Sequence, residues 1–409
     1  MSVRAARVLS VSLVTLACAA GMWPIVARSQ EGGLRDEPRS LATETSRRAA
    51  DRALRWLADH QEESGAWRCD VGFKLNEGYQ VEYPSEPHVG VTALAGTAFL
   101  AAGSLPDRGP YGENVKRALE FVMSCQRKEK DDDGLIQTGY ISRHGTRMYE
   151  HAFATLFLAE VYGMTHDPRV RAHLQRAVEY TYKSQNSQGG WRYVPHAEDS
   201  DMSIVVCQVM ALRAAKNKGI TVPKESIDKA VDYVLNSAIT RPRDWGDFDR
   251  GTFLYQYDPK NQAAAVQTRT SFALTSAGLT TLYGAGIYTN RDIAEFAAQR
   301  DLPKYRKGGD PLPRFDDMIK YVLEHYDEVA SPSKFNHYFF FYGNYYAAQA
   351  MFITGGREWE QYYSRLRDDL VRLQRPDGGT PSNVGTAFST AVTALLLEVP
   401  NNYLPIFQR

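Results

Sequence analysis

Two aspartates stand directly before one of the most apolar stretches of the sequence. Asp199 and Asp201 belong to the run His196–Ser203, which leads into a segment typical of a buried helix. A carboxylate at that position can accept backbone N–H groups and interact with the positive end of the helix dipole. Two carboxylates that face an open groove can instead act on a glycosidic bond. Capping and catalysis are therefore the alternatives for Asp201, with Asp199 as its partner.

Histidines occur at the starts of three apolar segments. His88 precedes the first segment, His151 begins the second and His337 precedes the fifth. Because imidazole changes its charge near neutral pH, histidines at equivalent helix ends are suited to carry protons or bind a ligand around one rim. The alternative for each is an ordinary buried or capping residue. We predict that His151 and His337 contact a substrate.

Aromatic side chains form a third group of candidates. The densest run, residues 337–346, contains Tyr342, while Trp191 and Tyr193 follow a pair of glycines. Aromatic faces stabilise carbocations through cation–π attraction, and carbohydrate sites also use aromatic platforms. Core packing is the alternative for most of these rings. We predict Tyr342, Trp191 and Tyr193 as substrate-binding residues.

Other chemistry has little support in the sequence. The acidic cluster Asp131–Gly134 follows a charged run and is typical of a solvated turn, with metal binding as the alternative. The chain has no Gly-rich phosphate loop and no Gly-x-Ser-x-Gly elbow. Zinc would need a closely spaced set of Cys, His and carboxylate ligands. We therefore predict neither a metal nor a cofactor.

An internal repeat must position these residues. Three segments, Arg52–Leu57, Arg117–Val122 and Arg176–Thr181, share one register: an aromatic residue follows an alanine by three positions, and a glutamine follows it by eight. Weaker copies occupy residues 229–234, 318–322 and 370–374. The apolar spacing within each copy is helical. The repeat therefore predicts six amphipathic helices.

Each amphipathic helix is followed by a more apolar one. The expected apolar helices cover residues 89–102, 151–162, 202–215, 268–283, 338–353 and 386–397. A helix that is apolar on most sides should be buried on most sides. The pattern predicts an all-α fold over residues 45–409, an (α/α)6 toroid of six helical hairpins. An open solenoid is the alternative, but its terminal repeats would carry polar caps, and the last segment is as apolar as the others.

The repeat resembles a known family. The segments Gln61–Trp67 and Gln185–Trp191 resemble the QW-type motifs of squalene cyclases and related terpenoid cyclases, a repeat that prenyltransferase β subunits share. The whole of residues 45–409 looks most like stand-alone bacterial prenyltransferase/squalene oxidase repeat proteins. The resemblance implies an (α/α)6 toroid. In such a motif we expect Gln to satisfy helix-end groups, Gly to permit a left-handed turn and Trp to pack on the neighbouring repeat.

The resemblance also suggests a role for the two aspartates. Asp199-x-Asp201 followed by Ser203 resembles the DxDD(T/S) acid motif of class II terpenoid cyclases, in which the residue matching Asp201 protonates an alkene or epoxide. Such an acid needs a raised pKa, which burial and a neighbouring carboxylate would give, with Asp199 and Glu198 as the source of the like charge. The sequence departs from the motif at Met202, where the family has an acid. No Asp-x-Cys stands where prenyltransferases hold zinc, which excludes protein prenylation.

Three functions remain open, and the sequence does not decide whether the protein is an enzyme. The first is protonation-initiated cyclisation of an apolar isoprenoid in a central cavity. The second is a non-catalytic toroid that binds a ligand or protein, and the third is a carbohydrate-active α/α toroid. The expected ligand is accordingly an apolar or glycan small molecule. A single ring argues against a complete squalene cyclase, which has two barrels.

The N-terminus predicts export. Arg4 and Arg7 precede the apolar run Val8–Ala27, and a small-x-small site ends at Ser29. We predict a signal peptide over residues 1–29, a linker over 30–44, and a periplasmic or secreted protein. An uncleaved membrane anchor is the alternative, because the run approaches the ~20 residues that span a bilayer. Peripheral contact with a membrane would give access to dissolved hydrocarbons.

Charge and cysteine content exclude other classes. The chain has 409 residues and equal numbers of basic and acidic residues, 48 each, so no basic surface for nucleic acid is expected. After signal removal three cysteines remain, which is too few for a disulfide scaffold. Cys207 is expected in the core, and a bridge between Cys69 and Cys125 stays open. The sequence does not specify an oligomeric state.

Overall fold

The computed structural model describes most of the chain beyond residue 40. The described residues are 41–75, 78–131, 134–144, 148–241, 250–257, 271–302, 309–331, 333–335, 337–402 and 404. Residues 38–409 form one compact unit. The predicted signal peptide and most of the predicted linker lie outside the described residues. None of the described helices is both long and apolar enough to cross a membrane.

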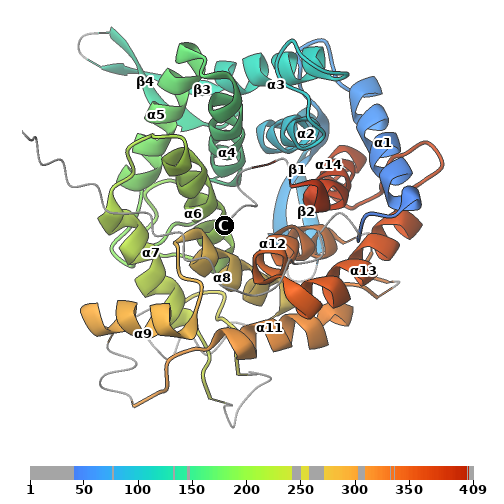
Figure 1. Ribbon diagram of the computed structural model, residues 1–409. Helices are drawn as coiled ribbons and strands as arrows, with labels where there is room; N and C mark the ends of the chain where they lie inside the picture. The colour runs from blue at the N-terminus through green and yellow to red at the C-terminus, as the bar shows by residue number, and fades with distance from the viewer. Residues whose placement is uncertain are drawn as a thin grey trace, which may run out of the picture. The chain divides into compact units, whose positions relative to one another are not determined.

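Six apolar helices form an inner ring (Figure 1). They are α2 (Val89–Ala101), α4 (Met148–Thr165), α6 (Met202–Asn217), α8 (Phe272–Gly284), α12 (Tyr338–Thr354) and α14 (Thr386–Glu398). Every residue of α2 and α8 is buried, because these helices contact neighbours on all sides. The six inner helices predicted from apolarity are confirmed.

Amphipathic helices surround this ring, each with one buried face. They are α1 (Glu44–Asp59), α3 (Gly112–Ser124), α5 (Pro168–Lys183), α7 (Lys224–Ser237), α9 (Asn290–Gln299), α11 (Phe315–Glu324) and α13 (Gly356–Leu373). Six of them match the predicted repeats. The short helix α9 follows α8 and was not predicted. The 3-10 turns η3 (Tyr326–Glu328) and η4 (Val399–Asn401) follow α11 and α14.

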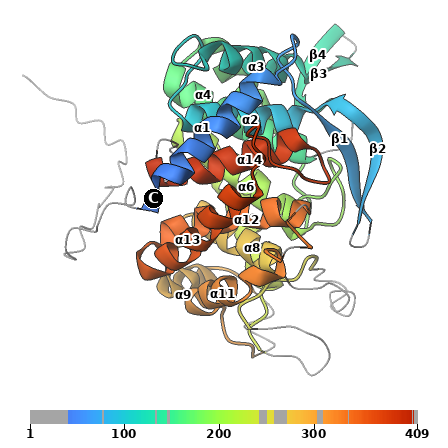
Figure 2. The same ribbon diagram turned by 90° about the vertical axis from the view of Figure 1, so that its right-hand side faces the viewer.

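The ring is closed. Inner helix α14 packs against both α12 and α2, and outer helix α1 packs against α13 and α14. The first and last hairpins are therefore neighbours, and they lie side by side in both views (Figures 1 and 2). This arrangement confirms the toroid and excludes the open solenoid.

Where a repeat keeps its glutamine, this residue joins the hairpin to the next one. Gln61 Nε2 donates to the carbonyls of Gly65 (2.9 Å), in its own loop, and Asn114 (3.0 Å), in the next outer helix. In return Arg117 Nη2 donates to Gln61 Oε1 at 2.7 Å. The same exchange occurs between Gln126 and Arg176. We call this arrangement the glutamine clamp; it explains the shared register of arginine and glutamine in the sequence.

The motif tryptophans donate hydrogen bonds within their own repeats. Trp67 Nε1 donates to Leu57 O at 2.9 Å, and Trp191 Nε1 donates to Thr181 O at 2.8 Å. Both carbonyls belong to the outer helix of the same repeat, not to a neighbouring one. Each fully buried indole therefore satisfies a carbonyl in the last turns of its own helix.

Two β-hairpins interrupt the helical pattern and were not predicted. Strands β1 (Arg68–Leu75) and β2 (Gly78–Pro87) pair antiparallel, as do β3 (Gln126–Asp131) and β4 (Gly134–Ile141). Each hairpin connects an outer helix to the N-terminus of the next inner helix, and both lie on one side of the ring in Figure 2. The predicted acidic turn falls between β3 and β4, where Asp132 and Asp133 lie outside the described residues.

The three cysteines of the described chain are free thiols. Cys69 and Cys207 are buried and Cys125 is partly buried, so the open alternative of a Cys69–Cys125 bridge is not formed. Burial raises the pKa of Cys69 to about 12 and of Cys125 to about 11. Thiols with such pKa values are poor nucleophiles near neutral pH. Cys207 is a core residue, as predicted.

Candidate functional site

Asp201 is the N-cap of inner helix α6 and is completely buried. Its Oδ1 accepts hydrogen bonds from the backbone N–H of Ile204 (3.0 Å) and from the hydroxyl of Ser203 (2.5 Å). Among the described residues its Oδ2 accepts no hydrogen bond, while Arg192 Nε lies 3.4 Å away. One oxygen of this carboxyl group therefore fixes the helix start, and the other is available for a proton.

Burial raises the pKa of Asp201 to about 6, although the Ser203 hydroxyl and the charge of Arg192 act in the opposite direction. The sequence predicted that burial and a neighbouring carboxylate would act together to raise this pKa. Instead Asp199 is exposed, where its Oδ2 contacts Arg192 Nη1 (2.5 Å) and Gln256 Nε2 (3.2 Å). Burial therefore raises this pKa as expected, and no like charge from a neighbouring carboxylate contributes.

Four tyrosines surround Asp201 and its neighbour Ser203. We call them the tyrosine shell: Tyr149 of α4, Tyr193 and Tyr255 of two loops, and Tyr342 of α12. Tyr149 donates to Ser203 Oγ (2.7 Å) and Tyr342 to Ser203 O (3.3 Å), while the hydroxyls of Tyr193 and Tyr255 are 2.5 Å apart.

The tyrosine rings also contact one another. The ring centroids of Tyr149 and Tyr193 lie 6.0 Å apart, and those of Tyr149 and Tyr342 lie 6.5 Å apart in an edge arrangement. Burial raises the pKa of Tyr149 and Tyr342 well above the ordinary phenol value, and the charge of Asp201 adds to it. The shell therefore stays neutral. Tyr193 and Tyr342 were predicted; Tyr149 and Tyr255 were missed.

Met202 occupies the position at which the cyclase motif has an acid. Its side chain is buried, and its backbone N–H donates to Tyr255 O at 2.9 Å. The side chains that contact the Asp201 carboxyl group are accordingly those of Ser203 and Arg192. Arg192, the residue after Trp191, was not among the predicted site residues.

The other predicted residues lie in different surroundings. His151 accepts from the backbone N–H of Ile141 at Nδ1 (3.2 Å), and its Nε2 donates to Thr181 Oγ1 (2.9 Å). Burial lowers its pKa to about 3, so it is neutral. The ring lies between α4 and outer helix α5, and its contacts account for it as a packing residue. Trp191 is also a packing residue, because it is buried and its Nε1 donates to Thr181 O. His337 caps α12, where its Nδ1 accepts from Phe339 N at 3.2 Å.

A second polar cluster lies at the N-terminus of α4 and was not predicted. Glu150 is completely buried, and its Oε2 accepts from the Ser142 hydroxyl (2.7 Å) and from Arg143 N (3.1 Å). Its Oε1 lies 3.3 Å from His144 Nδ1 and 3.7 Å from His88 Nδ1. Burial alone would raise the pKa of Glu150, but the hydrogen bond from His144, the charge of His88 and the Ser142 hydroxyl together lower it to about 2.

The pKa of Asp201 is therefore raised and that of Glu150 lowered, and the two residues belong to neighbouring helices. Tyr149, which contacts Ser203, and Glu150 are adjacent residues of α4, a helix that packs against α6 and α2. Two carboxyl groups whose pKa values are pushed apart in this way are suited to acid and base roles. Within the described ranges, no three His, Cys, Asp or Glu residues are arranged to hold a metal ion.

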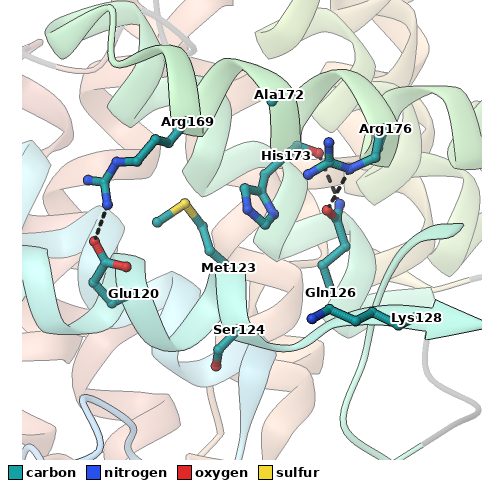
Figure 3. Close-up of a pocket in the computed structure, with 9 residues that line it drawn as sticks. All are labelled: Glu120, Met123, Ser124, Gln126, Lys128, Arg169, Ala172, His173 and Arg176. Atoms are coloured by element: carbon teal, nitrogen blue, oxygen red, sulfur yellow. Dashed lines mark hydrogen bonds and ion pairs between the residues drawn. The ribbon is translucent and has the colours of Figure 1, made fainter. Parts of the chain in front are cut away.

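A groove on the outside of the ring is less suited to chemistry. It lies between α3 and α5 and has a volume of about 530 Å³ (Figure 3). Glu120 and Arg169 form an ion pair across it at 3.1 Å, and Arg176 donates to Gln126 within the glutamine clamp. Its polar side chains thus serve to join two hairpins.

Fold and site together define an α/α toroid with a buried carboxyl group at the inner-helix rim. Among solved structures, the α-mannanase BT2949 of glycoside hydrolase family 76 from Bacteroides thetaiotaomicron aligns with a TM-score of 0.55 and 11% identity, over 90% of this chain and 98% of that one. An inactive variant of the α-1,6-mannanase GH76A from Salegentibacter sp. HEL1_6, in complex with α-1,6-mannotriose, gives 0.52 and 10% over 86% and 98%.

The type II terpene cyclase MstE from Scytonema, in complex with geranylgeranyl dihydroxybenzoate, aligns with a TM-score of 0.45 and 14% identity over 88% of this chain and 98% of that one. No protein-family model and no curated protein matches the sequence. The likeness to the mannanases is one of fold: this chain is an α/α toroid, and no specific family follows from it.

Proposed function

We propose that the protein is an acid catalyst in which Asp201 protonates an apolar isoprenoid and so starts its cyclisation. One observation carries the proposal: a completely buried carboxyl group, with a raised pKa and with Oδ2 free of hydrogen bonds among the described residues, lies within a shell of tyrosine rings. Alkenes are weak bases, so their protonation needs a carboxylic acid in a site from which water is excluded.

The groups around Asp201 can stabilise both charges that the reaction creates, the carboxylate and the carbocation. Once the proton has left, the carboxylate is stabilised by the Ser203 hydroxyl, the Ile204 N–H, the positive end of α6 and Arg192. The carbocation formed on the substrate is stabilised by the faces of the tyrosine shell through cation–π attraction. The shell is neutral, so it supplies quadrupoles without adding charge.

Asp201 is completely buried, so a substrate can reach it only if the residues that cover it move. Tyr193 and Tyr255 lie in loops, not in helices, and are joined by a single hydrogen bond between their hydroxyls. Separation of this pair is the movement through which a substrate would reach Asp201 in this proposal. Export through the predicted signal peptide would place the site where isoprenoids dissolved in a membrane can be reached.

A second candidate is glycan hydrolysis, favoured by Asp199. This exposed carboxylate lies two residues from Asp201 and shares Arg192 with it. A buried acid beside an exposed carboxylate is the pairing that glycosidases use. The solved α-mannanases with the same fold make α-mannans the first polysaccharides to test.

The experiment incubates purified wild-type protein with squalene or geranylgeraniol in detergent, and separately with α-mannan. Mass spectrometry would detect a cyclised isomer or hydrate of the isoprenoid. Asp201→Asn keeps the N-cap acceptor but removes the acid, so we expect at least a ~100-fold loss of product. Asp199→Asn, the same change at the exposed aspartate, should retain product from the isoprenoid.

Each alternative function gives a different result. Release of mannooligosaccharides, sensitive to both substitutions, would support glycan hydrolysis and overturn cyclisation. Absence of product from the wild type with both substrate classes would overturn both enzymatic proposals and favour a non-catalytic binding toroid.

A further inference from the structure

The geometry of the second polar cluster points to His144, held by Glu150, as the base that removes the final proton from the substrate. This inference rests on the proposed function and adds the group that ends the reaction which Asp201 begins. Glu150 is here a positioning residue, because it acts through the imidazole.

Glu150 fixes the tautomer of His144. Its Oε2 is occupied by the Ser142 hydroxyl and Arg143 N, so Oε1 is the oxygen that faces the imidazole, 3.3 Å from Nδ1. A carboxylate can only accept, so Nδ1 carries the hydrogen and the lone pair lies on Nε2. Among the described residues Nε2 has no hydrogen-bond partner. A carboxylate that orients an imidazole in this manner is the arrangement of a general base.

The imidazole lies beside an exposed aromatic side chain. The rings of His144 and Tyr83 have centroids 5.3 Å apart, and Tyr83 is 48% exposed. Val81 of the same strand β2 is also exposed, so this hairpin presents apolar surface next to the base. An apolar substrate that contacts Tyr83 would therefore lie within reach of Nε2, while the buried Glu150 would not touch it.

The two centres belong to one rim. Asp201 begins α6, Glu150 lies in the first turn of α4, and His88 caps α2. Tyr149 links α4 to the Asp201 site, and Glu150, the next residue, links α4 to His144. A chain-like substrate whose one end reaches Asp201 can thus present a distant carbon to His144.

The proposed step is balanced without any co-reactant. The Oδ2–H bond of Asp201 breaks and a C–H bond forms on the substrate alkene, which leaves a carbocation; ring closure forms C–C bonds and moves the charge. His144 Nε2 then takes a proton from the carbon next to the cation, and the electrons of that C–H bond form a new C=C bond. The product is an isomer of the substrate; His144 then releases its proton to solvent, and solvent returns a proton to Asp201. Without the base, water adds to the cation and gives an alcohol.

The test measures the ratio of isomer to hydrated product. His144→Asn places an amide N–H near the position of Nδ1, so it keeps the hydrogen bond to Glu150 and removes Nε2. We expect substrate consumption within about threefold of the wild type, because protonation by Asp201 is untouched. The ratio of isomer to alcohol should fall at least tenfold. Glu150→Gln should shift the ratio in the same direction. His166→Asn, the same change at an exposed turn after α4, should leave the ratio unaltered.

A readout that needs no substrate completes the test. In 15N NMR spectra of the full chain, the His144 signal, assigned as the one lost in His144→Asn, should show hydrogen on Nδ1; hydrogen on Nε2 would overturn the inference. An unchanged product ratio in folded His144→Asn, or a wild-type product that is only alcohol, would also overturn it. Absence of any isoprenoid product from the wild type would instead defeat the proposed function on which the inference rests.

Discussion

Gln374, in the last repeat, accepts a hydrogen bond from Arg52, in the first. Arg52 Nη2 lies 2.6 Å from Gln374 Oε1, while Gln374 Nε2 donates to the carbonyls of Ala49 and Gly378. The same glutamine clamp joins the first hairpin to the second through Gln61 and Arg117. The contact that closes the ring is therefore the same one that joins the first hairpin to the second. This explains why the first and last repeats share one sequence register.

Removal of this clamp should weaken the ring at its closure. In Gln374→Ala three hydrogen bonds are lost, each worth about 0.5–1.5 kcal/mol net, and Arg52 loses its acceptor. We expect a loss of about 2–3 kcal/mol in the free energy of unfolding, measured by urea denaturation. Gln188→Ala, at a residue outside the clamps, provides the control. Equal stability of Gln374→Ala and wild type would show that the clamp does not stabilise the ring.

The turn after Gln374 should tolerate only glycine. Gly378 has φ +96°, and a Cβ there would lie 2.4 Å from the carbonyl oxygen of Arg52. Gly378→Ala combines backbone strain with a clash against the first outer helix, so a cost of at least about 2 kcal/mol is expected. Gly103 offers a matched control, because its φ is +82° but a Cβ would meet nothing within 4 Å. Thermal unfolding should therefore rank Gly378→Ala well below Gly103→Ala, and the reverse ranking would contradict the structure.

Asp201 should make both activity and stability fall as the pH rises. Its pKa is about 6 in the folded protein against 3.8 for an unperturbed group, so the proton stabilises the folded state fully below pH 3.8. That stability is lost as the pH rises through 6, and it amounts to about 3 kcal/mol at the usual 1.36 kcal/mol per pKa unit. Product formation should decline above the same pH, because the acid is then ionised.

Asp201→Asn distinguishes the two roles considered for this residue, helix capping and acid catalysis. Asparagine keeps the cap at Ile204 N but carries no charge, so the variant should be more stable than wild type above pH 6 while its product falls at least ~100-fold. Melting temperatures at pH 4.5 and 8 measure the difference, with Asp199→Asn as the exposed control. A variant less stable than wild type at pH 8 would mean that the charge of Asp201 serves the helix dipole and not catalysis.

The fold could be predicted because apolar helices leave a strong local pattern. The prediction for residues 89–102 matches α2 at Val89–Ala101, and Asp201 and His337 were visible as residues that start helices. The hairpins could not be predicted, since β3 reads Gln-Arg-Lys-Glu-Lys-Asp and has no strand propensity. Its pairing with β4 depends on the surrounding fold.

The candidate site was predicted only where it coincides with a helix end. Asp201 stood out, but its burial, which sets its pKa, is a property of the assembled ring. Glu150 was not among the predicted residues, and its partner His144 lies in a connecting segment without periodicity. Tyr255 belongs to a loop more than 50 residues along the chain from Asp201. Such contacts arise from tertiary packing, which a single sequence does not encode at short range.

A buried carboxyl group far along α4 should lower stability above neutral pH. Glu160 is completely buried, neither of its oxygens has a hydrogen-bond partner among the described residues, and Lys218 Nζ lies 3.8 Å away. Burial raises its pKa to about 7 despite the charge of Lys218. Stability that is present below pH 4.5 is therefore lost as the pH rises through 7.

The substitution Glu160→Gln should remove this loss, since a neutral amide costs less to bury than a carboxylate. At pH 8 we expect a free energy of unfolding higher than that of wild type by up to about 3 kcal/mol, with little difference at pH 4.5. The matched control is Glu225→Gln, at an exposed glutamate paired with Lys229 on α7, where little change is expected at either pH. Denaturant titrations at both pH values measure these differences. If Glu160→Gln proved less stable than wild type at pH 8, the ion pair with Lys218 would outweigh the desolvation of the carboxylate.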